Sequence, residues 1–299
     1  MNRRHFLTTS AALATLALSS PARAFLGIDL GGAADDATGL DLTKLWDAGN
    51  DIVKSFNDIT PEQEYYIGRS VSAVILSKYH PFNNGSIRNY LTVLGTTLAQ
   101  GSSRPETFGG YSFQVLDSDE INALSAPSGF IFLTRGLLRC CRTEDAVAAV
   151  LAHEIAHVAH MHGLLAIQQS RLTSGLTILA QNGASLAGGD LGAVTQAFGG
   201  AITDVTTTMI DSGYSRDLEY EADQSALTTL KNVGYDPQAM VDMLQVMHQN
   251  LTDDAHGFGH THPAPEDRIE EVQAILGQYQ PPQPPPARAT RFMLTMGGV

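Results

Sequence analysis

Cysteine is almost absent from this chain of 299 residues, which contains only Cys140 and Cys141. Neighbouring cysteines rarely reach the geometry of a disulfide without strain, so a framework of disulfides is excluded. The stability of the protein must therefore come from a hydrophobic core, which a chain of this length can bury. We expect both thiols to lie inside that core.

Basic residues and long apolar runs are scarce as well. The chain has 18 Lys and Arg residues against 31 Asp and Glu residues, which gives a formal net charge of −13. This excess of negative charge argues against a nucleic-acid partner and disfavours docking on anionic lipid. No apolar run reaches the roughly 20 residues that a transmembrane helix needs. We expect no transmembrane segment in the mature chain, while peripheral contact with a membrane stays open.

The first 24 residues have the composition of an export signal. A basic start at Arg3-Arg4 precedes a mild apolar run at Ala11–Leu18, and small residues follow up to Ala24. The start resembles the twin-arginine motif of proteins that are exported already folded, and a general secretory signal is the alternative. Either signal predicts cleavage near Ala24 and a periplasmic protein.

The remainder divides into three parts by composition and periodicity. Residues 25–56 read as a flexible leader followed by a first helix, and residues 57–279 as the main domain. Residues 280–299 read as a proline-rich linker with a short tail. We therefore expect one domain that carries the function.

Within the main domain, helical periodicity surrounds one short β segment. Strands are predicted at Tyr111–Leu116 and Gly129–Thr134, with a turn-rich connection at Asn122–Gly129 between them. The fold class is therefore α+β and predominantly helical, with one small sheet. Helices are predicted at Pro61–Tyr79, Ile87–Gln100, Ala146–His162, Arg216–Asn232, Pro237–Gln249 and Pro265–Gly277.

The segment from His153 to His157, with the pattern HExxH, indicates metal chemistry. Residues four apart share one face of a helix, so both imidazoles can place a nitrogen about 2.0–2.1 Å from one zinc ion. Glu154 lies where it can reach a metal-bound water, whose pKa zinc lowers to about 7. We predict one Zn²⁺ per chain with Glu154 as general base. The pattern also occurs by chance, as two histidines on a helix surface.

A third ligand is predicted on a distant helix. Glu219 and Asp223 are four residues apart and share a helix face. Glu219 would bind the metal, while Asp223 would accept the free N–H of a metal-bound histidine. A run of solvated carboxylates is the alternative. Because position 163 is Gly163, the third histidine of the metzincin pattern is missing, and that class is excluded.

A histidine-rich segment, residues 256–263, follows later in the chain. Glycines flank its imidazoles, which suits a movable loop. His262 could occupy the open zinc position and hold the enzyme latent, or it could polarise the substrate carbonyl. Arg268 could stabilise the oxyanion of the tetrahedral intermediate. A histidine-rich surface loop without a role is the alternative.

Taken together, these motifs resemble the HtpX and BepA type of zinc endopeptidase, the family that includes the CAAX prenyl proteases. The resemblance covers roughly Pro61 to Gly277. Two features of the family are not expected here: the transmembrane helices of the integral-membrane members and the tetratricopeptide repeats of the larger periplasmic members. The segments that carry it are Ser128–Leu138, Ala146–His160, Ser215–Asp223 and Thr261–Pro263 with Arg268.

The resemblance implies a gluzincin-like HExxH metalloprotease domain with the ligands and the general base named above. It also implies that His262 completes the zinc sphere in a latent state, and that peptides pair with Phe130–Thr134 as an edge strand. Leu124 and Ser128 depart from residues common in the family, which affects the shape of that edge. The implied function is zinc-dependent cleavage of misfolded or stalled envelope proteins. The alternative is a chaperone or assembly factor for outer-membrane proteins with gated or minimal proteolysis.

Overall fold

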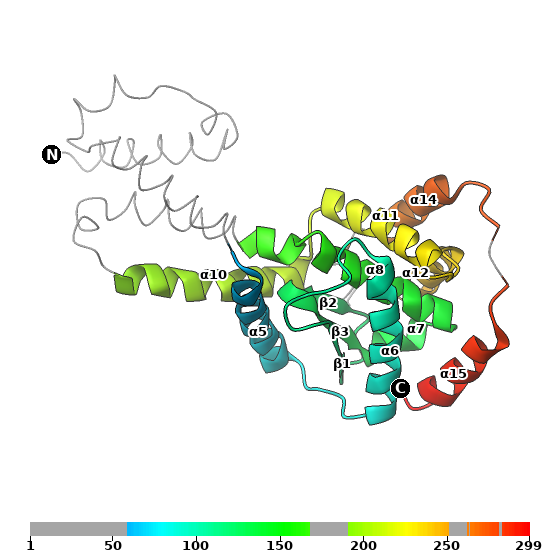
Figure 1. Ribbon diagram of the computed structural model, residues 1–299, viewed down its shortest axis with the longest axis horizontal. Coiled ribbons are helices and arrows are strands. Elements are labelled where there is room, and N and C mark those ends of the chain that lie inside the picture. Colours follow the sequence, from blue (N-terminus) through cyan, green and yellow to red (C-terminus); the bar gives the residue numbers. More distant parts are fainter. Residues whose placement is uncertain (1–58, 168–190, 251–261, 263, 281–282) are drawn as a thin grey trace, which may run out of the picture.

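The computed structural model describes residues 59–167, 191–250, 262, 264–280 and 283–299 (Figure 1). The predicted export signal and leader lie outside these residues. The strands are β1 (Ser112–Leu116), β2 (Ala123–Ala126) and β3 (Phe130–Thr134), with a short 3₁₀ turn at Pro127–Gly129. The helices are α5 (Pro61–Lys78), α6 (Gly85–Gly101), α7 (Arg135–Cys140), α8 (Glu144–Ala159), α10 (Leu191–Ser212), α11 (Arg216–Asn232), α12 (Gln238–Asn250), α14 (Pro265–Leu276) and α15 (Pro286–Met296).

The predominantly helical α+β fold with one small sheet is confirmed. Helix ends agree with local sequence signals: Thr60 caps α5 in front of Pro61, and the Thr143 side chain accepts a hydrogen bond from the backbone N–H of Ala146 at the start of α8. Throughout the described part of the chain, no helix is both long enough and apolar enough to cross a bilayer.

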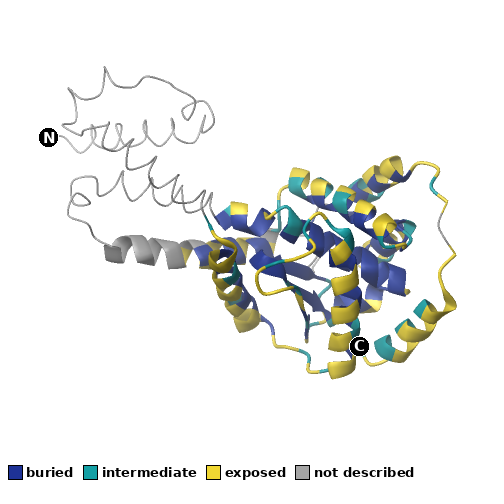
Figure 2. Cartoon of the chain, in the orientation of Figure 1, coloured by how far each residue is buried: buried dark blue, intermediate teal, exposed yellow. Residues whose placement is uncertain are grey.

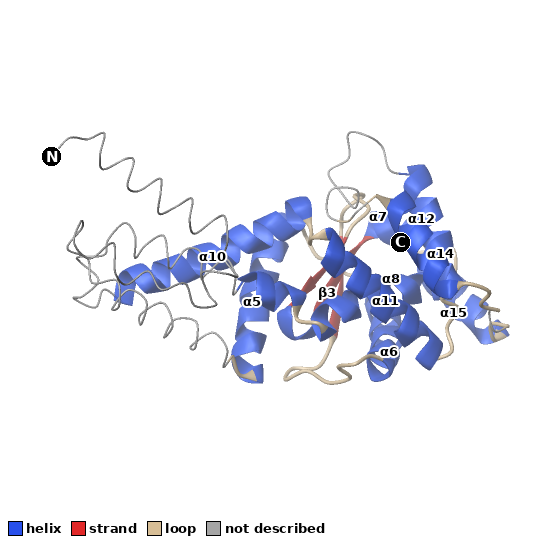
Figure 3. Ribbon diagram, turned by 90° about the horizontal axis from the view of Figure 1, so that it is seen from above, coloured by secondary structure: helices blue, strands red, loops and turns tan. Residues whose placement is uncertain are grey.

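The three strands pair in the order β1-β3-β2. β1 runs parallel to β3, and β2 runs antiparallel to it. Helices cover both faces of the sheet (Figure 3). Because side chains alternate along a strand, Ile131 and Leu133 of β3 join the core formed with α6 and α8, whereas Phe132 joins the core formed with α5 and α10.

Two predictions about this sheet are wrong. The connection predicted at Asn122–Gly129 contains a strand, because Ala123–Ala126 is extended and pairs with β3. The prediction that Phe130–Thr134 is an edge strand fails for the same reason, since β1 and β2 already occupy both of its hydrogen-bonding sides. Asn122 and Pro127 are turn residues by composition, and here they mark the two ends of β2.

Helix α8 lies at the centre of the domain. Its residues from Glu144 to Val158 are all buried (Figure 2). α6, α11, α12 and β2 pack around it. A helix that is buried on every side needs apolar side chains around most of its circumference, and the alanines and valines of α8 provide them. The polar groups that it carries are therefore enclosed by protein.

The chain turns sharply just after α8. The helix predicted to continue to His162 ends at Ala159, and Met161 has a backbone φ of 58°. This left-handed conformation is uncommon for a residue with a side chain and breaks the helix. A new helical segment begins at His162.

The residues predicted as a C-terminal tail form a docked helix, α15. Its Arg288 donates to Asp145 at 2.9 Å and lies 3.8 Å from the centroid of the Tyr235 ring. Arg291 donates to Glu144 at 2.5 Å. Both acceptors belong to the first turn of α8, so two arginines of α15 supply positive charge to buried carboxylates.

Candidate metal centre

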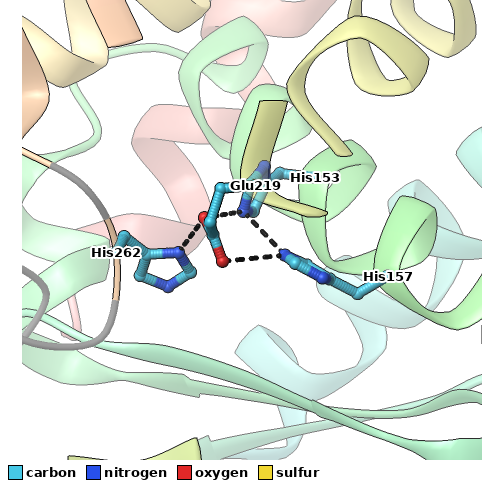
Figure 4. Close-up of side chains that lie close together, drawn as sticks. All are labelled: His153, His157, Glu219 and His262. Atoms are coloured by element: carbon cyan, nitrogen blue, oxygen red, sulfur yellow. Dashed lines mark hydrogen bonds and ion pairs between the residues drawn. The ribbon is translucent and has the colours of Figure 1, made fainter. Parts of the chain in front are cut away.

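His153 and His157 meet at the centre of the domain. They lie one helical turn apart on α8, and their Nε2 atoms are 3.1 Å from each other. Both side chains are buried. The predicted common face of the two imidazoles is therefore present, and both rings point towards α11 (Figure 4).

Glu219 on α11 brings a carboxylate to the same point. Its Oε2 atom lies 3.4 Å from Nε2 of His153, and its Oε1 atom lies 3.4 Å from Nε2 of His157. The small residues Ala222 and Ala226 are fully buried on the same helix, which allows α11 to lie close against α8.

His262 approaches the cluster from the side of Glu219 that faces away from His157 (Figure 4). Its Nδ1 atom is 2.5 Å from Oε2 of Glu219, and its side chain is buried (Figure 4). One ligand atom from each of His153, His157, Glu219 and His262 lies within 4.8 Å of the others. The neighbouring His256 and His260 lie outside the described residues.

Asp223 lies on the outer side of His153, as the helix spacing predicts. Nδ1 of His153 is 2.8 Å from Oδ1 of Asp223. Arg268 on α14 donates to both oxygens of this carboxylate, at 2.8 and 2.6 Å. Although burial opposes it, the charges of Arg268 and His153 lower the pKa of Asp223. The ionised carboxylate therefore holds the proton of His153 on Nδ1 and leaves Nε2 facing the centre. The oxyanion role of Arg268 stays a prediction.

Two residues that the sequence reasoning did not assign a role contact His157. His162 places its Nδ1 atom 2.9 Å from Nδ1 of His157, and the Tyr214 ring stacks on the His157 ring with centroids 4.4 Å apart. A spacing of five residues does not predict the first contact, because it depends on the break at Met161. Tyr214 lies two residues before α11, and nothing in its spacing predicts the stacking.

The cluster fits a divalent metal. With Nδ1 of both histidines engaged on the outside, the two Nε2 atoms face the same point 3.1 Å apart, where a bound cation would accept both lone pairs. Within the described residues, Oε1 of Glu219 is buried and makes no hydrogen bond. Two imidazole nitrogens and a carboxylate oxygen form a donor set that first-row divalent metals accept.

Charges in the cluster shift its acid–base properties. Burial raises the pKa of Glu154, against the opposing influence of His153 and His262. Burial also holds the pKa of His157 well below its usual range. Although burial opposes it, His262 and His157 hold the pKa of Glu219 well below normal. The site thus combines a neutral imidazole and an ionised carboxylate with a second carboxyl, Glu154, that holds its proton more tightly than usual.

A buried donor set of this kind, with a glutamate beside its first histidine, is characteristic of HExxH metalloprotease domains. Comparison with known protein families agrees. The profile of Peptidase family M48 matches residues 87–276, well over half of the chain, so the chain belongs to that family.

Individual relatives are similar over most of this chain. It is 29% identical over 206 residues to the beta-barrel assembly-enhancing protease of Escherichia coli (strain K12), an alignment that covers 67% of this chain and 41% of the relative. It is 25% identical over 240 residues to the mitochondrial metalloendopeptidase OMA1 of Schizosaccharomyces pombe, covering 76% of this chain and 65% of the relative. The chain thus spans less than half the length of the assembly-enhancing protease.

Proposed function

We propose that the protein is a zinc endopeptidase, with His153, His157 and Glu219 as the zinc ligands. The observation that carries the proposal is the convergence of these three buried side chains, from two helices far apart in sequence, on one point. A bound zinc ion would supply Lewis-acid chemistry: it polarises a peptide carbonyl and lowers the pKa of a water molecule.

Glu154 is the general base in this proposal. Its carboxyl is buried beside the ligand His153, and its Oε1 atom makes no hydrogen bond within the described residues. The carboxylate accepts a proton from the attacking water and afterwards returns it to the leaving amine. The raised pKa makes the carboxylate a stronger base, which favours the first of these transfers.

His262 holds the resting state of this site. It contacts Glu219 at 2.5 Å and belongs to the same group of potential ligands. A side chain in that place competes with the substrate carbonyl, so the proposal includes displacement of His262 before cleavage. Arg268, bound to Asp223, keeps its predicted role of stabilising the developing oxyanion only if it moves from that pair.

Envelope proteins are the proposed substrates, and the periplasm is the proposed location. The basis is the name of the Escherichia coli relative, the beta-barrel assembly-enhancing protease, together with the composition of residues 1–24. The edge strand next to α8 is β2, so we place an extended peptide there and not on the central strand β3. A chaperone or assembly factor with minimal proteolysis remains the second candidate, since that relative is named for assembly.

One variant tests the proposal. Glu154→Gln keeps the shape of the side chain and removes its basicity, so casein cleavage should fall by about 10²-fold or more while one zinc per chain is retained. Glu62→Gln, an exposed change in α5, serves as the control and should leave cleavage unchanged. Cleavage that survives both Glu154→Gln and chelation would refute the catalytic assignment.

A further inference from the structure

His162 contacts a proposed zinc ligand from outside the metal cluster. On an unbroken helix, a residue five positions after His157 would lie about 140° around the axis from it. The left-handed backbone at Met161 changes this course and brings the His162 ring against the His157 ring. The His162 side chain is 1% exposed, and its Nδ1 atom lies 2.9 Å from Nδ1 of His157.

The tautomers of both rings follow from this contact. A neutral imidazole that offers Nε2 to a metal carries its proton on Nδ1. Nε2 of His157 faces the cluster, so its Nδ1–H donates outward and Nδ1 of His162 accepts. The proton of His162 then lies on Nε2, which donates to Oε2 of Glu221 at 3.1 Å.

We propose that His162 is a positioning residue: it fixes the tautomer and the ring orientation of the metal ligand His157, and Glu221 anchors it. The inference rests on the proposed zinc site and deepens it. Under this proposal, the two histidine ligands have different hydrogen-bond acceptors at Nδ1. Asp223 supports His153 directly, whereas a carboxylate supports His157 through a neutral imidazole.

The position of His162 between His157 and Glu221 has an electrostatic consequence. A second carboxylate in direct contact with His157 would add a buried negative charge beside Glu219 and Glu154. Glu221 is instead 48% exposed, so its charge remains in contact with water. The arrangement keeps the outer acceptor of His157 inside the protein and places the anionic end of the chain of hydrogen bonds at the surface.

A second metal site is the competing explanation. His160, His162 and Glu221 also lie close enough to share an ion, with Nδ1 of His160 3.3 Å from Glu221. A metal on Nε2 of His162 would require the proton on Nδ1, and two Nδ1–H groups would then face each other at 2.9 Å. The hydrogen-bond chain and a second metal therefore exclude each other while His157 is a ligand.

The test is the zinc affinity of the full chain, measured by competition with a chelator. His162→Leu removes the acceptor, and the affinity should fall by about 10- to 100-fold. His162→Asn keeps a polar atom near the position of Nδ1 and should restore most of the affinity. His160→Gln is the matched control: His160 contacts Glu221, Ser225 and the His162 ring but contributes no atom to the hydrogen bonds from His157 to Glu221, so the affinity should not change.

Circular dichroism of each metal-free variant shows whether it folds, and the Asn variant keeps the test valid if the Leu variant does not. Equal affinity in folded His162→Leu, or no difference between the Asn and Leu variants, would overturn the positioning role. So would two zinc ions per wild-type chain, one of which His160→Gln removes. A wild type without any zinc affinity would instead overturn the proposed function itself, and the inference with it.

Discussion

Glu64 on α5 and Arg104 in the loop after α6 form a partly buried ion pair with two hydrogen bonds, in which the Glu64 side chain is the buried member. The two N···O distances are 3.0 and 2.6 Å. Glu64 also accepts from the backbone N–H of Ser128, whose φ of 64° is left-handed, and Arg104 donates to the carbonyl of Val158 near the end of α8. One pair thus connects α5, the turn before β3 and α8, the helix that carries His153 and His157.

Breaking this pair should be costly. Glu64→Ala leaves the Arg104 guanidinium without a counter-charge and the backbone N–H of Ser128 without an acceptor. We expect the free energy of unfolding to fall by about 3 kcal/mol, as measured by urea denaturation. Lys78→Ala, which breaks an ion pair whose side chains are 46% and 54% exposed, should cost less than about 1 kcal/mol. Similar losses for both variants would contradict the structure.

His262→Ala should increase the rate of casein cleavage. The substitution removes the side chain that contacts Glu219 and leaves room for a substrate carbonyl. The measurement is the initial rate at saturating zinc, compared with His248→Ala, which changes a histidine that is half exposed on α12. A lower rate than wild type would mean that His262 assists the reaction and does not block it.

Asp223→Asn should weaken both the fold and the metal site. The Arg268 guanidinium is almost fully buried and would lose the charge of its partner Asp223, while His153 would lose the charge that orients it. We expect a loss of about 3 kcal/mol in the stability of metal-free protein and at least about 10-fold in zinc affinity. Asp217→Asn, an exposed change on the same helix, is the control and should alter neither quantity.

Chelation should lower the melting temperature. Zinc that binds only the folded state at a free concentration about 100 times its dissociation constant adds about 2.7 kcal/mol, or about 5–10 °C for a domain of this size. Glu154→Gln should show the same shift as wild type, because it keeps the three proposed ligands. His157→Ala should show almost none, and a full shift in that variant would exclude His157 as a ligand.

Cys140 and Cys141 should resist thiol reagents in the folded protein. Burial raises the pKa of both thiols. An exposed cysteine reacts faster as the pH rises from about 7 to 9, because its thiolate fraction increases across a pKa of about 8.5. With raised pKa values, the rate of alkylation should stay low and nearly flat over that range, and it should rise sharply in urea. Fast labelling of native protein would show that the thiols are accessible.

The sequence predicts the parts of this molecule that depend on local spacing. The separation of four residues between His153 and His157, and between Glu219 and Asp223, is enough to place each pair on one helix face, and the structure brings the two faces together. The capping residue Thr143 likewise determines where α8 begins. These features need only the geometry of an α-helix.

Features that depend on distant partners escape such reasoning. β2 is four residues long with every side chain buried, so it has no visible alternation, and only its pairing with β3 makes it a strand. The contact of His162 with His157 requires the turn at Met161, a residue with no sequence preference for left-handed backbone. The docking of α15 depends on carboxylates of α8 about 140 residues earlier in the chain.

The complete enclosure of α8 also determines when this helix can open. Amide groups in the most enclosed element of a domain exchange their hydrogens with solvent only when the whole domain unfolds. The rate of deuterium uptake along α8 should therefore report the global stability of the protein, while uptake in the exposed parts of α6 and α15 should report local fraying.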